Sequence, residues 1–318
     1  MRNEPTYWQR YDLVFKAYSL KKIFLEILEI AKSIGKPFSK KGKRGPKFKV
    51  QPEEYAAYTA FEIVTHNSPY RDMELGSELY LSKHIDHSTF AKNFEKTPLN
   101  YFMMLLEKIA GMLDKLLGKA RIKIMDSTRV STYVHEKKIR KLDEIKEKID
   151  FKFHSLVSYN PKKKAIYFDT VLATDRHTSD AEGAKQMVER KPEKAKYFAD
   201  RAYDSNKVYE QILKANGIPI VKPRRIKPKM ATLMSSCRKK YKPKPYKQIR
   251  GRVEVCYGGL ENAGLLVTKL RKPENINKRN VIIAIKQNLS TLLRVSVELF
   301  LRINRQTRFL VTANRSLR

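Results

Sequence analysis

Cysteine is scarce in this 318-residue chain, which has only Cys237 and Cys256, and the two are not in Cys-x-x-Cys spacing. A disulfide-stabilised scaffold and a cysteine-rich zinc module are therefore excluded, and this use of cysteine fits a reducing cytoplasm. The chain has no long apolar run, so the sequence predicts no membrane span. Its first residues, MRNEPTYWQR, are polar and aromatic and do not resemble a signal peptide.

Acidic residues are also few. The chain has 33 Asp and Glu residues against 67 Lys and Arg, a formal net charge of +34 at pH 7. Because so large an excess of one sign repels itself in the folded state unless a polyanion offsets it, DNA or RNA is the predicted partner. An anionic membrane is a weaker candidate, since the basic segments have no clean amphipathic face. Hydrophobic residues make up 42% of the chain and are spaced periodically, so we expect an ordered core.

The first part of the chain, residues 1–118, is predicted to be helical and basic. A basic arm over residues 32–49 contains no acidic residue. We expect this part to bind the ends of a DNA element, although no recognition helix can be identified in it. Apolar spacing and capping residues predict helices at Tyr11–Ala31, Pro52–Val64, Arg71–Leu79, from Ser88 or Thr89 onward, and Leu99–Leu117.

The second part, residues 119–318, alternates between strand and helix patterns. Its order predicts a mixed sheet with helices on its faces, an α/β fold of ribonuclease-H-like order. The basic stretch 222–252 is predicted to be a loop, and helices complete the chain. Strands are predicted at residues 121–128, 151–160, 165–174, 195–200 and 218–223, and helices at Glu136–Lys148, 177–190, 205–217 and Val281–Leu301.

Three acidic residues in this second part are candidates for a metal site. Asp126 ends or nearly ends the first predicted strand, and Asp200 ends the strand YFAD. Strand ends in α/β sheets face the ligand crevice, and two carboxylates that meet there repel each other unless a cation lies between them. Mg²⁺ suits such a site because it takes oxygen ligands and shares them with phosphate. Glu254, on a predicted helix, would supply the third ligand.

Each of these residues also has an ordinary interpretation. Asp126 precedes Ser and Thr and is compatible with a turn, and Asp200 precedes Arg201 and is compatible with an ion pair. Glu254 is compatible with a surface salt bridge, which contributes about 0–1 kcal/mol. Only the ordered combination of the three, in a strongly basic chain, favours the metal site.

Three segments together resemble the DDE transposases of prokaryotic insertion sequences, nearest to the IS5-like branch of the IS4/IS5 superfamily. The strand ending in DST at 126–128 is similar to the first motif of that family. The segment DRAYD at 200–204 is similar to its second motif, and RGRVE at 250–254 to its Arg-x3-Glu signature. The phrase RHTSD at 176–180 resembles the segment that precedes the second motif. The resemblance extends over most of residues 40–290.

The resemblance implies an enzyme that cleaves DNA by metal-dependent hydrolysis and joins the freed 3′-hydroxyl ends to target DNA. Asp126, Asp200 and Glu254 would be catalytic and would hold two Mg²⁺ ions, for which Mn²⁺ can substitute. The implied partner is double-stranded DNA, at the transposon ends and the target, and the active complex would be a homodimer at the nucleoid in the cytoplasm. We expect basic residues near the site to contact DNA phosphates: Arg201, Lys222, Arg224, Arg225, Lys247, Arg250 and Arg252.

The chain departs from the family pattern at two positions. Lys247 stands where the family often has tyrosine, and Glu261 stands seven residues after Glu254, where a basic residue usually contacts phosphate. Alternative functions are therefore a catalytically decayed or domesticated sequence-specific DNA-binding protein and a structure-specific Mg-dependent nuclease. The charge alone would also allow an RNA-associated protein.

Overall fold

The structure is a computed structural model that describes residues 19–39, 47–134, 147–225, 233–262, 264–265, 270 and 272–315. Its first part is helical, as predicted. The predicted bounds of α6 agree with the structure, whereas α5 begins earlier than predicted because Asp86, not Ser88 or Thr89, is its N-cap and accepts a hydrogen bond from the Ser88 backbone N–H at 2.7 Å. The helices are α2 (Leu20–Ile34), α3 (Pro52–Thr65), α4 (Tyr70–Leu81), α5 (His87–Lys96) and α6 (Leu99–Leu117).

The second part contains a mixed sheet with the strand order β3-β2-β1-β4-β5. β1 pairs antiparallel with β2, and β2 pairs antiparallel with β3, whereas β1, β4 and β5 run parallel. This order and these directions are those of the predicted ribonuclease-H-like fold. The strands are β1 (Ile122–Val134), β2 (Glu147–Asn160), β3 (Ala165–Asp175), β4 (Lys196–Ala199) and β5 (Ile218–Val221).

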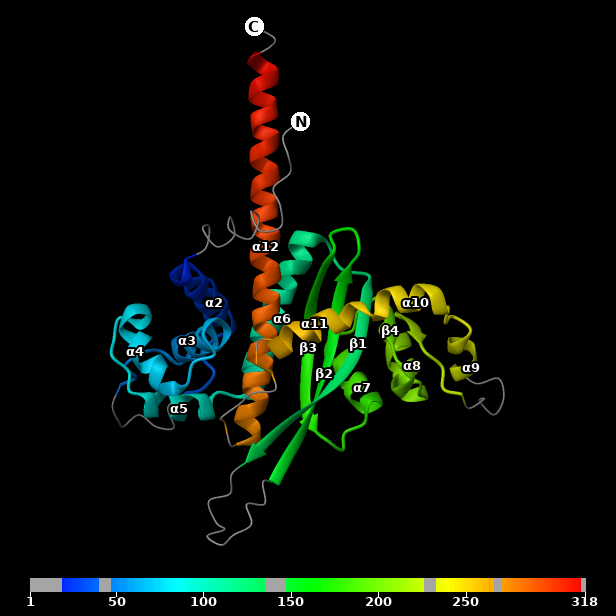
Figure 1. The fold of residues 1–318 in the computed structure, drawn as a ribbon, viewed down its shortest axis with the longest axis horizontal. Coiled ribbons are helices and arrows are strands. Elements are labelled where there is room, and N and C mark those ends of the chain that lie inside the picture. Colours follow the sequence, from blue (N-terminus) through cyan, green and yellow to red (C-terminus); the bar gives the residue numbers. More distant parts are fainter. Residues whose placement is uncertain are drawn as a thin grey trace.

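Helices cover both faces of the sheet (Figure 1). On one face, Met125 and Leu156 pack with residues of α7 (Asp180–Arg190) and α8 (Asn206–Lys214). On the other face, Ile124 shares a core with residues of α6, α11 (Arg252–Asn262) and α12 (Pro273–Arg315). Because side chains of a strand alternate between faces, Asp126 points toward the same face as Ile124, where α11 lies.

One hydrophobic core joins the first helices to the sheet. It contains Phe24 of α2, Phe61 of α3, Leu106 of α6, Phe168 of β3 and Ile285 of α12. The long helix α12 runs between the α2–α5 group and the sheet (Figure 1). The division of the chain at residues 118 and 119 stays a prediction. Among the described residues, no helix combines the length and the apolar character needed to cross a membrane.

Other predicted elements also differ from the structure, and the start of the predicted helix Tyr11–Ala31 lies outside the described residues. β1 does not end at a turn near Thr128 but continues to Val134, since the β-branched and aromatic residues that follow pair with β2. The predicted helix Glu136–Lys148 lies mostly outside the described residues, and its last two positions belong to β2. The predicted basic loop 222–252 contains two helices in its described part, α9 (Leu233–Arg238) and α10 (Pro243–Arg250).

Candidate active site

Asp126 and Asp200 lie on neighbouring strands at the same level. β1 and β4 pair in parallel up to Met125 and Ala199, and Asp126 and Asp200 are the residues that come directly after this pair. Asp126 continues in β1, whereas Asp200 leaves the sheet and accepts a hydrogen bond from the backbone N–H of Ala202 at 2.8 Å. The parallel pairing therefore ends at the two aspartates, at the edge where α/β sheets bind ligands.

Helices α10 and α11 are held beside Asp126 at two points. Arg250 Nη2 lies 2.8 Å from Asp126 Oδ2. In α11, the Tyr257 hydroxyl lies 2.7 Å from Ser155 Oγ, and Ser155 is the β2 residue paired with Asp126. Between them, Gly251 keeps helical backbone angles (φ −61°, ψ −14°), so α10 leads into α11 nearly without a break.

Glu254 lies between these two points of attachment. It follows Arg250 by four residues and precedes Tyr257 by three, a spacing that places all three on one side of a helix. Its side chain is exposed. Within the described residues, the oxygens of Asp126, Asp200 and Glu254 do not come within 4.8 Å of one another as a group. The structure thus brings the two aspartates together and places the glutamate on the adjacent helix.

The Asp126 carboxyl is hard to ionise. Burial raises its pKa to about 6, the nearby charges of Asp200 and Asp180 add to this, and the Arg250 guanidinium opposes it. A group of carboxylates that repel each other in a partly buried site favours binding of a cation.

The donor set fits a hard divalent ion. All three candidate ligands offer carboxylate oxygen, which Mg²⁺ and Mn²⁺ prefer. Asp126 already holds one cation, the guanidinium of Arg250, of which Nε and Nη1 are buried without a hydrogen-bond partner. The residues present are therefore compatible with the metal that the sequence resemblance implies.

A second layer of polar residues supports the site from the opposite face. Ser127 donates a hydrogen bond to Asp180 Oδ1 at 2.5 Å, and Lys152 Nζ lies 3.0 Å from the same oxygen. Sequence reasoning assigned no role to Ser127 or Lys152, because their contact with α7 depends on how that helix packs. His154 of β2 is fully buried, and burial lowers its pKa to about 4.

The basic residues predicted to contact DNA fall into two groups. Arg201, Arg225 and Lys247 are exposed near the site, and Lys222 is partly buried. The others already have partners within the fold. Arg224 donates to the backbone carbonyls of Arg201 and Ala202, Arg250 contacts Asp126, and Arg252 lies over the Tyr159 ring at 6.0 Å.

A different acidic cluster, formed by Asp114, Asp169 and Glu193, does have oxygens within 4.8 Å of one another. Buried Lys123 contacts Asp169 directly and lies 2.6 Å from Glu193 Oε2, and Lys191 lies 2.6 Å from Asp169 Oδ1. The cluster sits near the start of β1 and β4, away from the edge marked by Asp126. Asp169 and Glu193 are already paired with lysines, and Asp114 accepts a hydrogen bond from the Tyr167 hydroxyl, so we interpret the cluster as a structural network.

Comparison with known families shows which family the chain belongs to. A family model described as "Transposase DDE domain" matches residues 117–289, more than half of the chain. The chain belongs to the transposase DDE-domain family. All three candidate ligands of this DDE-domain protein lie inside the matched region, and no curated protein sequence matches the chain.

Two solved structures also align with this DDE-domain chain. The crystal structure of the Mos1 strand transfer complex aligns at 11% identity, over 70% of this chain and 78% of that one, with a TM-score of 0.22. The crystal structure of a pre-cleavage Mos1 transpososome aligns at 10% identity, over 91% and 97% of the two chains, with a TM-score of 0.20. Superposition is poor at these scores, so the assignment rests on the family match and on the strand order.

Proposed function

We propose that this protein is a transposase of the IS5-like branch that binds the terminal inverted repeats of an insertion sequence, cleaves DNA at those ends and joins them to target DNA. The observation that carries the proposal is the pairing of β1 with β4, which ends at Asp126 and Asp200. The ion pair between Arg250 and Asp126 supports it, because this contact holds the helix of Glu254 beside the two aspartates.

Asp126, Asp200 and Glu254 would hold two divalent ions, Mg²⁺ or Mn²⁺. Such ions lower the pKa of a bound water and stabilise the oxygen that leaves phosphorus. For Glu254 to contribute, its exposed side chain has only to reach toward Asp126 from the same side of the helix as Arg250. The guanidinium of Arg250, released from Asp126, would then be available to a DNA phosphate, to which arginine donates two parallel hydrogen bonds.

The proposed chemistry consists of two phosphoryl transfers at one site. In the first, water attacks the phosphorus at the element's end, the P–O3′ bond breaks, and a 3′-hydroxyl and a 5′-phosphate result. In the second, that 3′-hydroxyl attacks a phosphorus of target DNA, forms a new phosphodiester and releases a target 3′-hydroxyl. No covalent intermediate with a serine or cysteine is needed, and the buried Cys237 and Cys256 are consistent with this.

DNA would be held by the exposed basic residues near the site and by the basic first part of the chain, residues 1–118. Arg201 and Arg225 are exposed two residues after β4 and four residues after β5, so we expect them to contact phosphates next to the scissile bond. Two ends are brought together in transposition, which implies at least two copies of the protein in the working complex. Acting on genomic DNA, the protein would work at the nucleoid in the cytoplasm.

A cleavage and joining assay tests the proposal. With purified protein, Mg²⁺ and DNA carrying the inverted repeats that flank the gene, we expect nicks with free 3′-hydroxyls at the repeat ends, followed by joined target products. Nicks without joined products would indicate the structure-specific nuclease. Binding of the repeats with no nicks in Mg²⁺ or Mn²⁺ would indicate the catalytically decayed DNA-binding protein.

The unusual residue Glu261 leads to a second expected result. Glu261 is exposed on α11, seven residues after Glu254, where a carboxylate would repel a nearby phosphate. Replacing Glu261 with lysine should tighten binding of the repeat ends and steepen the log–log salt dependence of binding by about one unit, because one more phosphate contact releases one more counterion. Filter binding or fluorescence anisotropy across a salt series measures both.

The control is Glu210→Lys, which makes the same charge change at an exposed position on α8. It should alter the salt dependence much less. An equal effect of the two substitutions would mean that only the overall charge matters and that Glu261 has no place at the DNA.

A further inference from the structure

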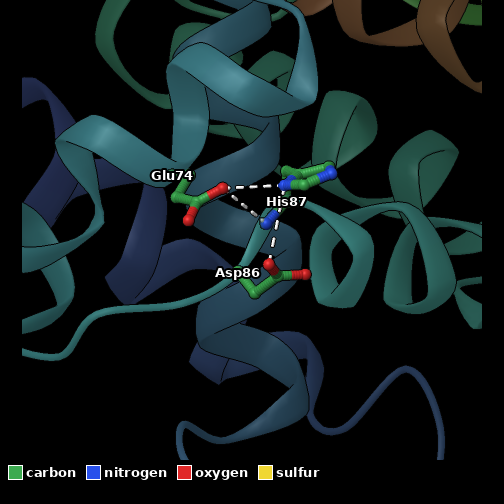
Figure 2. Close-up of side chains that lie close together, drawn as sticks. All are labelled: Glu74, Asp86 and His87. Atoms are coloured by element: carbon green, nitrogen blue, oxygen red, sulfur yellow. Dashed lines mark hydrogen bonds and ion pairs between the residues drawn. The ribbon is translucent and has the colours of Figure 1, made fainter.

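A cluster of metal-ligating side chains joins α4 to α5, far along the chain from the candidate active site. Glu74 comes from α4, and Asp86 and His87 from the start of α5 (Figure 2). Glu74 Oε2 lies 2.8 Å from His87 Nδ1, and His87 Nδ1 lies 3.6 Å from Asp86 Oδ2. We refer to Glu74, Asp86 and His87 as the α4–α5 cluster.

The spacing of these atoms matches a small transition-metal site. Zn²⁺ binds imidazole nitrogen and carboxylate oxygen at about 2.0–2.2 Å in a tetrahedron, which places neighbouring ligand atoms roughly 3.3 Å apart. The observed separations of 2.8 and 3.6 Å lie on either side of that value. All three ligand atoms lie within 4.8 Å of one another, so an ion that entered would draw the Glu74 and Asp86 oxygens together around it.

Two ligands of the cluster are fixed by the backbone around them. Ile85 is fully buried, and its N–H donates to Ser77 Oγ at 3.0 Å, which anchors the connection between the helices. Asp86 Oδ1 accepts from the Ser88 N–H at 2.7 Å, so its other oxygen is left to face His87. The site therefore does not depend on a loop that must first become ordered.

Glu74 is held as well. Its Oε2 accepts the His87 backbone N–H at 3.1 Å, and its Oε1 lies 3.2 Å from His84 Nε2. Ligating carboxylates are commonly oriented by a further partner in this way. His84 is thus placed to orient Glu74 from outside the cluster.

The α4–α5 cluster contains two acidic residues, whereas the chain as a whole is strongly basic. The chain has twice as many cations as anions, yet none of the ion pairs in its described part joins Glu74 or Asp86 to a lysine or arginine; their charged partners are histidines. The acidic network around Lys123 differs, because lysines already neutralise it.

We propose that the α4–α5 cluster is a binding site for one Zn²⁺ ion, with Glu74 Oε2, Asp86 Oδ2 and His87 Nδ1 as its protein ligands and His84 as the residue that orients Glu74. The nitrogen ligand distinguishes this site from the all-oxygen set at Asp126, and it selects zinc over magnesium. The ion would tie α4 to α5 and stiffen the first part of the chain. The inference does not depend on the proposed transposase function.

Isothermal titration of the full-length protein with Zn²⁺ tests the proposal. The protein carries Asp126→Asn and Asp200→Asn, so that ions bound at the candidate active site do not contribute. We expect one equivalent of Zn²⁺ to bind, and we expect His87→Ala or Glu74→Gln to weaken that binding by at least about tenfold. Bound zinc should also raise the melting temperature of the parent protein but not that of either variant.

Glu78→Gln is the matched control, because it removes the same charge one turn further along α4, at a side chain that is 70% exposed and contacts only His84 among the histidines. It should keep the affinity within about twofold. If Glu74→Gln does not fold, Asp86→Asn replaces it, since asparagine also caps a helix. Absence of zinc binding by the parent protein, or equal affinity in the His87, Asp86 and Glu78 variants, overturns the proposal.

Discussion

Replacing Asp126 with asparagine is expected to abolish strand cleavage while leaving DNA-end binding in place. The substitution keeps the size of the side chain but removes the charge that would hold a metal ion beside the scissile phosphate. Metal ions contribute several kcal/mol to such transition states, so we expect a loss of at least roughly 10³-fold in cleavage rate. The affinity for DNA depends on basic residues elsewhere and should change little. Quantifying 3′ ends on repeat DNA, with mobility-shift assays in parallel, measures the two effects.

Asp72→Asn provides the control, because it makes the same chemical change at an exposed aspartate of α4. Its cleavage rate should stay within about twofold of the parent rate. Unchanged nicking by the Asp126 variant would end the assignment of this residue as a ligand. A loss of DNA binding together with cleavage would instead indicate that Asp126 supports the fold through Arg250.

Replacing Lys123 with methionine is expected to produce the largest loss of stability. Lys123 is fully buried and is the shared partner of Asp169 and Glu193. Removing one partner of a buried ion pair leaves unpaired charge in the core and costs about 3–5 kcal/mol. At about 2–4 °C per kcal/mol, the melting temperature should fall by on the order of 10 °C. Thermal unfolding followed by circular dichroism measures the change.

Neutral pH is the right condition for this measurement. Although burial alone would lower the pKa of Lys123, the charges of Asp169 and Glu193 raise it, so its contribution is present below its ordinary pKa and is lost at higher pH. Burial alone would raise the pKa of Asp169, but Lys123 and Lys191 lower it, so its contribution is lost only as the pH falls into the acidic range. Both contributions are therefore complete near pH 7.

Lys119→Met is the comparison. Lys119 also contacts Glu193, at 3.6 Å, but its side chain is 66% exposed, and pairs of that kind contribute about 0–1 kcal/mol. If both lysine variants unfold at the same temperature, the network is not the structural element that we infer. Adding Asp169→Asn to Lys123→Met should recover part of the loss, because it removes one of the charges left unpaired.

The sequence predicted the sheet well because its strands carry strong local signals. The β-branched and aromatic runs of β2 and β3, and the turn that follows Asn160, predict the antiparallel pair and all but the first residues of β2. The strand-and-helix order that follows is compatible with few sheet topologies. In the observed topology, the parallel pairing of β1 with β4 sets Asp126 beside Asp200. The neighbourhood of the two aspartates was therefore predictable without coordinates.

Other features could not be predicted, since they depend on packing between distant segments. Asp-Ser-Thr at 126–128 is a turn-like sequence, but β2 supplies a partner strand that keeps β1 extended to Val134. The basic stretch 222–252 has helices because Tyr246 is buried, which gives a lysine-rich segment an apolar side. The α4–α5 cluster is not recognisable as a sequence motif, because Glu74 and His87 are thirteen residues apart and meet only when their helices pack.

Because β1 continues past Asp126, the three candidate ligands differ in how firmly the fold holds them. Asp126 lies within a strand whose residues before and after it are all paired with β2, so hydrogen bonds hold its backbone in place. Asp200 stands at the first bend after β4, and Glu254 is on a helix outside the sheet. Any tightening of the three carboxylates around ions must therefore come from the side of Asp200 and α11. One anchored ligand and two adjustable ones would let the protein close on DNA phosphate without distorting its central strand.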